Sequence, residues 1–226
     1  MEYSDSDQVI QVLDGIVSTR VIHHPDRAFA FEVTLDLLKG AKFFAQKPPL
    51  HFHANQAEYI QAIQGKTGLE LEGREIVLSP GSPEYYIGSW VNHRSYPISI
   101  PLQDGVEKVK FLLSGAKTPE PFQLNTLFFE NWYRYQENVL STGKRIDLIQ
   151  ILSTFDGGGT YLSPPSWMPC GGRISQIFGV VVGRWLGGLL GYQPFYREWS
   201  SDWELACRQM QTSIFQRRFA KFHKAD

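Results

Sequence analysis

The chain has 226 residues, of which 42% are apolar and 14% aromatic, and its formal net charge is −1 at pH 7. This length and apolar content allow one domain with a sizeable core, or one domain with an extension. The nearly balanced charge gives no electrostatic basis for nucleic-acid binding, so we expect no nucleic-acid partner.

Cysteine usage and the first residues indicate the compartment. The two cysteines, Cys170 and Cys207, form no CxxC motif. One disulfide or a metal ligand would be compatible with them, but ordinary buried thiols in a reducing compartment are the better interpretation. Residues 1–5 are acidic and polar, which predicts no secretory signal. We therefore expect an intracellular, cytoplasmic protein.

Residues 1–27 are expected to form an N-terminal arm. Apolar residues in 5–20 recur at nearly helical spacing, but Gly15 interrupts them, so a short helix and an edge strand both fit. His23 and His24 precede Pro25-Asp26, which indicates a solvated turn in preference to a metal site.

Residues 28–117 have the pattern of a β-domain. Short segments rich in β-branched and aromatic residues are separated by Gly, Pro, Asn or Asp. The predicted strands are 28–35, 58–64, 67–72, 75–78, 84–87, 96–100 and 106–113. Regular short strands of this kind predict an antiparallel sandwich or barrel.

Residues 118–226 are expected to form a largely helical extension packed on the barrel or on a partner chain. After a proline-containing linker at 118–121, apolar residues three or four apart predict a helix over 124–139, with Gly143 as its stop. A second helix is expected within 144–155, and 156–159 looks like a flexible break. Ser201 and Glu204 have the spacing of a capping box. The helix after it should carry one apolar stripe, formed by Trp203, Cys207, Met210 and Ile214. Its C-terminal end should be basic, with Arg217, Arg218 and Lys221.

Residues 174–192 are almost entirely apolar, with Arg184 near the middle. The segment is long enough to consider membrane insertion, but a central arginine costs about 2.5–3.5 kcal/mol there. Gly179 and Gly183 permit close helix contact. We favour packing on the barrel or on a partner chain, and keep peripheral membrane contact as the main alternative.

The strongest chemical signal is His51-Phe52-His53, followed by Glu58. Residues i and i+2 of a strand point to the same face, so the two imidazoles can approach one ion. A turn over 54–56 would allow the Glu58 carboxylate to join them. Imidazoles with a carboxylate suit Fe, Mn, Ni, Cu, Co or Zn.

His51, His53, Glu58 and Gly65 together match the pattern His-x-His-x4-Glu-x6-Gly and resemble the first motif of the cupin family. The glycine that usually precedes the first histidine by six residues is replaced by Ala45. The second cupin motif is degraded, and its histidine would be His93. An alternative alignment makes Glu84 the last ligand, but His93 keeps the usual order of glycine, strand, turn and histidine.

The resemblance covers about residues 28–115 and implies a mainly β protein, a cupin β-barrel or jelly roll. It also implies a divalent transition metal held by His51, His53, Glu58 and His93, a small-molecule substrate and a homodimer. A weaker resemblance to small fungal biosynthetic cupins suggests a role in secondary-metabolite biosynthesis. We expect a metal-dependent enzyme, either a dioxygenase or a Lewis-acid isomerase, cyclase or decarboxylase. A non-catalytic ligand-binding module is the alternative.

Overall fold

The computed structural model describes residues 4–98 and 107–221, with side chains from residue 9 onward. The ends of two predicted strands, at 99–100 and at 106, therefore lie outside the described residues. The chain divides into two compact units. One consists of Met1–Phe52 and Gln56–Thr118, and the other of His53–Asn55 and Pro119–Asp226.

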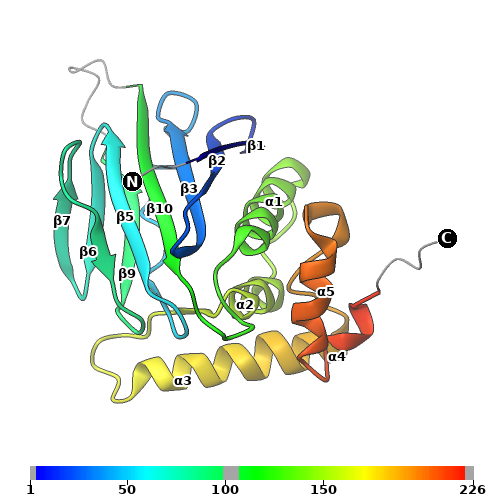
Figure 1. The fold of residues 1–226 in the computed structure, drawn as a ribbon. Helices are drawn as coiled ribbons and strands as arrows, with labels where there is room; N and C mark the ends of the chain where they lie inside the picture. Colours follow the sequence, from blue (N-terminus) through cyan, green and yellow to red (C-terminus); the bar gives the residue numbers. More distant parts are fainter. Residues whose placement is uncertain (1–3, 99–106, 222–226) are drawn as a thin grey trace. The chain divides into compact units, whose positions relative to one another are not determined.

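The first unit contains a six-stranded antiparallel sheet in the order β1-β2-β3-β10-β5-β8 (Figure 1). Its strands are β1 (Ser4–Val12), β2 (Val17–His23), β3 (Arg27–Asp36), β5 (Glu58–Gln64), β8 (Tyr85–Ile87) and β10 (Lys108–Ala116). The residues expected to be an N-terminal arm thus form two strands of this sheet. Leu13, Asp14 and Gly15 all have positive φ, so the glycine that interrupts the apolar pattern marks the turn between β1 and β2.

A second antiparallel sheet has the order β4-β9-β6-β7 in this unit. Its strands are β4 (His51–His53), β9 (His93–Pro97), β6 (Thr67–Leu71) and β7 (Arg74–Leu78). β11 (Thr160–Leu162) belongs to the second unit, together with His53–Asn55.

The period-two pattern explains how the central strands form a core. Phe31, Val33 and Leu35 alternate along β3 and are all buried. Val109 and Phe111 on β10 pair with β3 in register, at Leu35 and Val33 respectively. Two antiparallel sheets around an apolar interior are the cupin-type jelly roll, so the predicted fold class is confirmed.

The second unit is mainly helical. It contains α1 (Thr126–Thr142), α2 (Leu148–Gly157), α3 (Gly171–Phe178), the π-helix η2 (Gly179–Leu186), α4 (Gly187–Leu190) and α5 (Trp203–Gln211), with short 3₁₀ turns at Arg197–Trp199 and Arg217–Phe219. Leu127, Phe195, Ala206 and Met210 form a buried cluster. The predicted stop of the first helix is confirmed, because Gly143 follows α1 with a left-handed φ of 64°.

Three local predictions in this unit were wrong. The last helix is capped by Asp202, whose carboxylate accepts from the Leu205 amide, so Ser201 is not the capping residue. That helix ends at Gln211, which leaves Ile214 exposed and places the basic residues at 217, 218 and 221 beyond its end. Cys170 is exposed, whereas Cys207 is buried; both are free thiols.

The glycines expected to form a flexible break are instead tightly packed. Gly157 ends α2, and a Cβ on Gly158 would lie 2.3 Å from the Phe128 ring. Gly159 has φ +61°, and a Cβ there would meet the carbonyl oxygen of Phe122 at 2.4 Å. These positions require glycine because neighbouring atoms occupy the space of a side chain.

No helix in the described residues is both long and apolar enough to cross a membrane.

Candidate metal site

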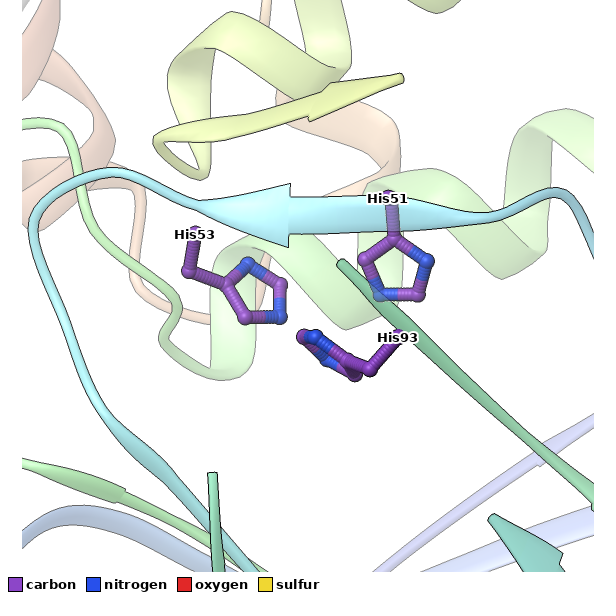
Figure 2. Close-up of side chains that lie close together, drawn as sticks. All are labelled: His51, His53 and His93. Atoms are coloured by element: carbon purple, nitrogen blue, oxygen red, sulfur yellow. The ribbon is translucent and has the colours of Figure 1, made fainter. Parts of the chain in front are cut away.

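Three histidines converge from two neighbouring strands. His51 and His53 project from the same face of β4, as the strand period requires, and His51 pairs in register with His93 on β9 (Figure 2). One nitrogen from each ring can be chosen so that all three lie within 4.8 Å of one another. The ring centroids of His51 and His93 are 4.6 Å apart. The histidines found in the sequence are therefore brought together.

Each of the three rings has its Nδ1 beside a protein oxygen. His51 Nδ1 lies 3.1 Å from the Pro49 carbonyl oxygen, and His93 Nδ1 lies 2.8 Å from that of Val91. His53 Nδ1 lies 3.0 Å from the hydroxyl oxygen of Thr160. Oxygens placed in this way orient metal-binding histidines in many proteins, because the nitrogen opposite them then faces the ion.

These contacts determine where the protons sit. A carbonyl oxygen can only accept, so Nδ1 of His51 and of His93 must carry the hydrogen. Thr160 Oγ1 donates to the Gly158 carbonyl at 3.4 Å, so its oxygen accepts from His53 Nδ1. All three rings therefore hold a proton on Nδ1 and direct the Nε2 lone pair elsewhere, which is the form that ligates a metal.

Glu58, the predicted carboxylate ligand, starts β5 and is 7% exposed. Its Oε2 lies 3.0 Å from Nε2 of His93. Because His93 Nδ1 already donates to Val91, two acceptors face each other unless a second proton or a cation lies with them. Glu58 and His93 would therefore be able to hold a shared ion through Oε2 and Nε2. The Glu58 oxygens are not part of the three-histidine cluster itself.

The pKa values of the rings follow from burial and neighbouring charge. Burial, with the neighbouring His93, lowers the pKa of His51 to about 4, so this ring is neutral at physiological pH. Burial also opposes charge on His93, but the hydrogen bond and negative charge of Glu58 outweigh it and raise the pKa of His93.

The other sequence candidates lie away from this cluster. Glu84, the alternative last ligand, pairs with Arg27 at 2.8 Å. Gly65, the glycine of the first motif, has φ +70° in the turn between β5 and β6. His24 Nδ1 accepts from the Asp26 amide, which closes the turn expected there. No pattern in the sequence pointed to Thr160, because it lies 107 residues after His53.

The donor set fits a divalent transition metal. Three neutral imidazoles, each oriented through Nδ1, form a borderline-soft nitrogen site, and a carboxylate would add one hard ligand. The cluster is thus placed to bind a metal, whose identity the ligand types do not fix.

Comparison with known proteins identifies relatives along most of the chain. It is 40% identical over 215 residues to "Probable oxidoreductase yanE" of Aspergillus niger, covering 92% of this chain and 82% of that protein. It is 34% identical over 230 residues to "Probable oxidoreductase patJ" of Penicillium expansum, covering 95% and 69%. "Epoxidase atD" of Aspergillus terreus is 36% identical over 171 residues, covering 76% of this chain and 52% of that protein.

Among solved structures, the similarity extends over about half of the chain. An RmlC-like cupin from Methanocaldococcus jannaschii, described as a double-stranded β-helix, matches 50% of this chain and 93% of its own. The identity is 14% and the TM-score 0.34. No family model matches the chain.

Proposed function

Because this chain belongs to the family of fungal oxidoreductases that includes yanE of Aspergillus niger, we propose that it is a metal-dependent cupin oxidoreductase acting on a small organic metabolite. The names of its relatives, an epoxidase among them, support redox chemistry in preference to the isomerase or cyclase alternative. A role in secondary-metabolite biosynthesis is part of this proposal. The substrate is expected to be small and largely apolar or aromatic.

The observation that carries the metal part of the proposal is the shared orientation of the three histidines. His51, His53 and His93 each donate Nδ1–H to a protein oxygen and so present Nε2 for coordination. Glu58 is proposed as the fourth ligand on the basis of its 3.0 Å contact with His93. Coordination through His93 Nε2 would require this nitrogen to carry no proton, so metal binding is expected to weaken as the pH falls.

A bound redox-active ion such as Fe would supply electron transfer to or from O2 and substrate, whereas Zn, Ni or Mn would polarise a carbonyl as a Lewis acid. The chain itself orients the imidazoles and keeps water away from them. His53 and His93 are 4% and 2% exposed, so their lone pairs are held in a water-poor environment. Phe52, between the two histidines of β4, stacks on Trp90 with centroids 5.1 Å apart and fixes the strand that carries them.

The first experiment measures metal binding. Protein purified without added metal is offered Fe, Mn, Ni and Zn, and bound metal is quantified by mass spectrometry. We expect one equivalent for the native chain and a loss of at least tenfold in affinity for His53→Ala. His24→Ala is the control, because His24 lies in a turn outside the cluster. If the native chain binds none of these ions, the metalloenzyme proposal fails.

The second experiment separates the reaction classes. The Fe(II)-loaded chain is screened with small aromatic metabolites in an oxygen electrode, with product analysis in parallel. Substrate-dependent O2 uptake that His53→Ala abolishes supports the oxidoreductase. Conversion without O2 uptake would instead indicate Lewis-acid chemistry. Ligand binding without conversion, unchanged in His53→Ala, would indicate a non-catalytic binding module.

A further inference from the structure

The helical segment α3–η2–α4 of the second unit has one face that packs inward and one that is exposed. The three elements follow each other without a break, from Gly171 to Leu190 (Figure 1). The inward face is a row of glycines at multiples of four residues: Gly171, Gly179, Gly183 and Gly187 are all buried. A Cβ on Gly183 would lie 2.4 Å from the Leu152 carbonyl oxygen, so the backbone of η2 touches that of α2 directly.

The π-helix keeps this face aligned. An α-helix has 3.6 residues per turn, so positions four apart drift around its axis. The i→i+5 hydrogen bonding of a π-helix adds residues to each turn and offsets that drift. Residues four apart therefore stay in line along the segment, on the outer face as well as on the inner one.

The outer face consists of two such rows of large apolar side chains. Their exposed fractions range from 40% to 62%. The exposed members are Ile174, Ile177, Phe178, Val181, Trp185, Leu186, Leu189 and Leu190. Trp167, in the loop before α3, is 77% exposed. At about 1.5 Å per residue the helical part of the strip is roughly 25 Å long, and apolar surfaces of this extent mark interaction sites.

The one charge in the middle of the segment does not lie on this face. Arg184 pairs with the fully buried carboxylate of Asp156 through two contacts of 2.6 and 2.8 Å. Its guanidinium also stacks on the Phe122 ring, 3.4 Å from the centroid. Contact between the outer face and an apolar medium would therefore not require this arginine to lose its partner.

The charges around the strip are cationic. Residues 157–196 contain no Asp or Glu. Arg173 is exposed at the start of α3, and Arg218 reaches the Leu189 carbonyl at the end of α4, next to Arg217. Cations beside an apolar helix face with Trp residues are typical of helices that lie in the headgroup region of a bilayer.

A second copy of this chain suits the strip less well. In an antiparallel pairing, Arg173 of one copy would approach Arg217 and Arg218 of the other. In a parallel pairing, each cation would meet its own equivalent. No acidic residue of the segment could compensate either arrangement, whereas anionic lipid headgroups would.

We propose that residues 171–190, with Trp167, form a docking face that lies on an anionic lipid surface without crossing it. This proposal is independent of the metal site. It predicts a peripheral, reversible association that weakens as salt screens the cations.

The test is co-sedimentation of the full chain with vesicles of phosphatidylcholine alone or with phosphatidylserine. The native chain should bind the anionic vesicles at least tenfold more tightly than the neutral ones. The double substitution Ile177→Ser/Leu189→Ser should lower that binding at least tenfold. Leu140→Ser/Ile146→Ser is the matched control, because these side chains are equally exposed elsewhere, at 63% and 64%.

A charge variant tests the contribution of the cations without relying on the serine substitutions. Arg173→Gln should weaken binding to anionic vesicles severalfold, whereas Arg145→Gln, at an exposed position away from the segment, should not. The proposal is overturned if the native chain fails to sediment with anionic vesicles, or if the control pair reduces binding as much as the test pair. It is also overturned if sedimentation velocity without lipid shows a dimer that Ile177→Ser/Leu189→Ser dissociates, which would assign the face to a second copy.

Discussion

Thr160 offers a direct test of how a hydroxyl outside the histidine motif orients His53. Its hydroxyl oxygen accepts the Nδ1 proton of His53 at 3.0 Å, and both residues are buried. Thr160→Val keeps the side-chain shape and removes this acceptor, together with the long hydrogen bond that the hydroxyl donates to the Gly158 carbonyl. The His53 ring then either leaves a buried N–H without a partner or moves the proton to Nε2, the atom required for coordination.

The magnitude follows from two independent considerations. A buried donor left without a partner costs about 1–3 kcal/mol. Loss of the oxygen that orients a metal-binding histidine typically lowers metal affinity by about 10–100-fold, or about 1.4–2.7 kcal/mol. The two ranges overlap, so we expect Thr160→Val to bind Zn or Fe(II) about 10–100-fold more weakly than the native chain.

Affinity is measured by competition with a chromophoric chelator, and folding by circular dichroism. Thr67→Val is the matched control: Thr67 is fully buried, and its hydroxyl has no hydrogen-bond partner among the described residues. Thr160→Ser retains the hydroxyl and should restore most of the affinity. The reasoning is refuted if folded Thr160→Val binds metal within twofold of the native chain, or if Thr67→Val weakens binding as much.

Three further predictions concern the stability of the second unit. Gly183→Ala should destabilise the chain by about 1–3 kcal/mol in urea unfolding, since its Cβ would overlap the Leu152 carbonyl oxygen. Arg184→Met should cost about 3–5 kcal/mol because it leaves Asp156 buried without its cation, and adding Asp156→Asn should recover part of that loss in the same measurement. Burial raises the pKa of Glu130 above its usual 4.5, so the folded state holds this proton to higher pH than the unfolded state and stability falls as pH rises through that window. Glu130→Gln should therefore gain stability relative to the native chain as the pH rises above 4.5, measured by unfolding at several pH values.

Each of these predictions has a result that contradicts it. Gly88→Ala is the control for Gly183→Ala, because the nearest atoms to its Cβ would be 3.6 Å away. Equal unfolding midpoints for the two alanine variants would show that the close α2–η2 contact is not required. A double variant no more stable than Arg184→Met would show that the unpaired Asp156 charge is not the cause of the loss. A pH-independent difference for Glu130→Gln would show that this carboxyl group titrates alike in both states.

The sequence by itself determined the features that depend on local spacing. The strand period of two places His51 and His53 on one face wherever the strand lies, because successive side chains alternate. The same period located the buried strands, and Gly143 ends α1 because a left-handed φ favours glycine. These inferences needed no knowledge of distant residues.

Only the tertiary structure decided the contacts that join distant parts of the chain. It places the Thr160 hydroxyl beside His53 and pairs the Arg184 guanidinium with Asp156. It also shows that four glycines of the α3–η2–α4 segment are buried while its largest apolar side chains are exposed; the glycines are Gly171, Gly179, Gly183 and Gly187. Local pattern cannot supply these contacts, because their partners are brought together by the folding of separate elements. The sequence of residues 174–192 is almost entirely apolar and shows no difference between faces. Only packing against α2 distinguishes a buried face from an exposed one.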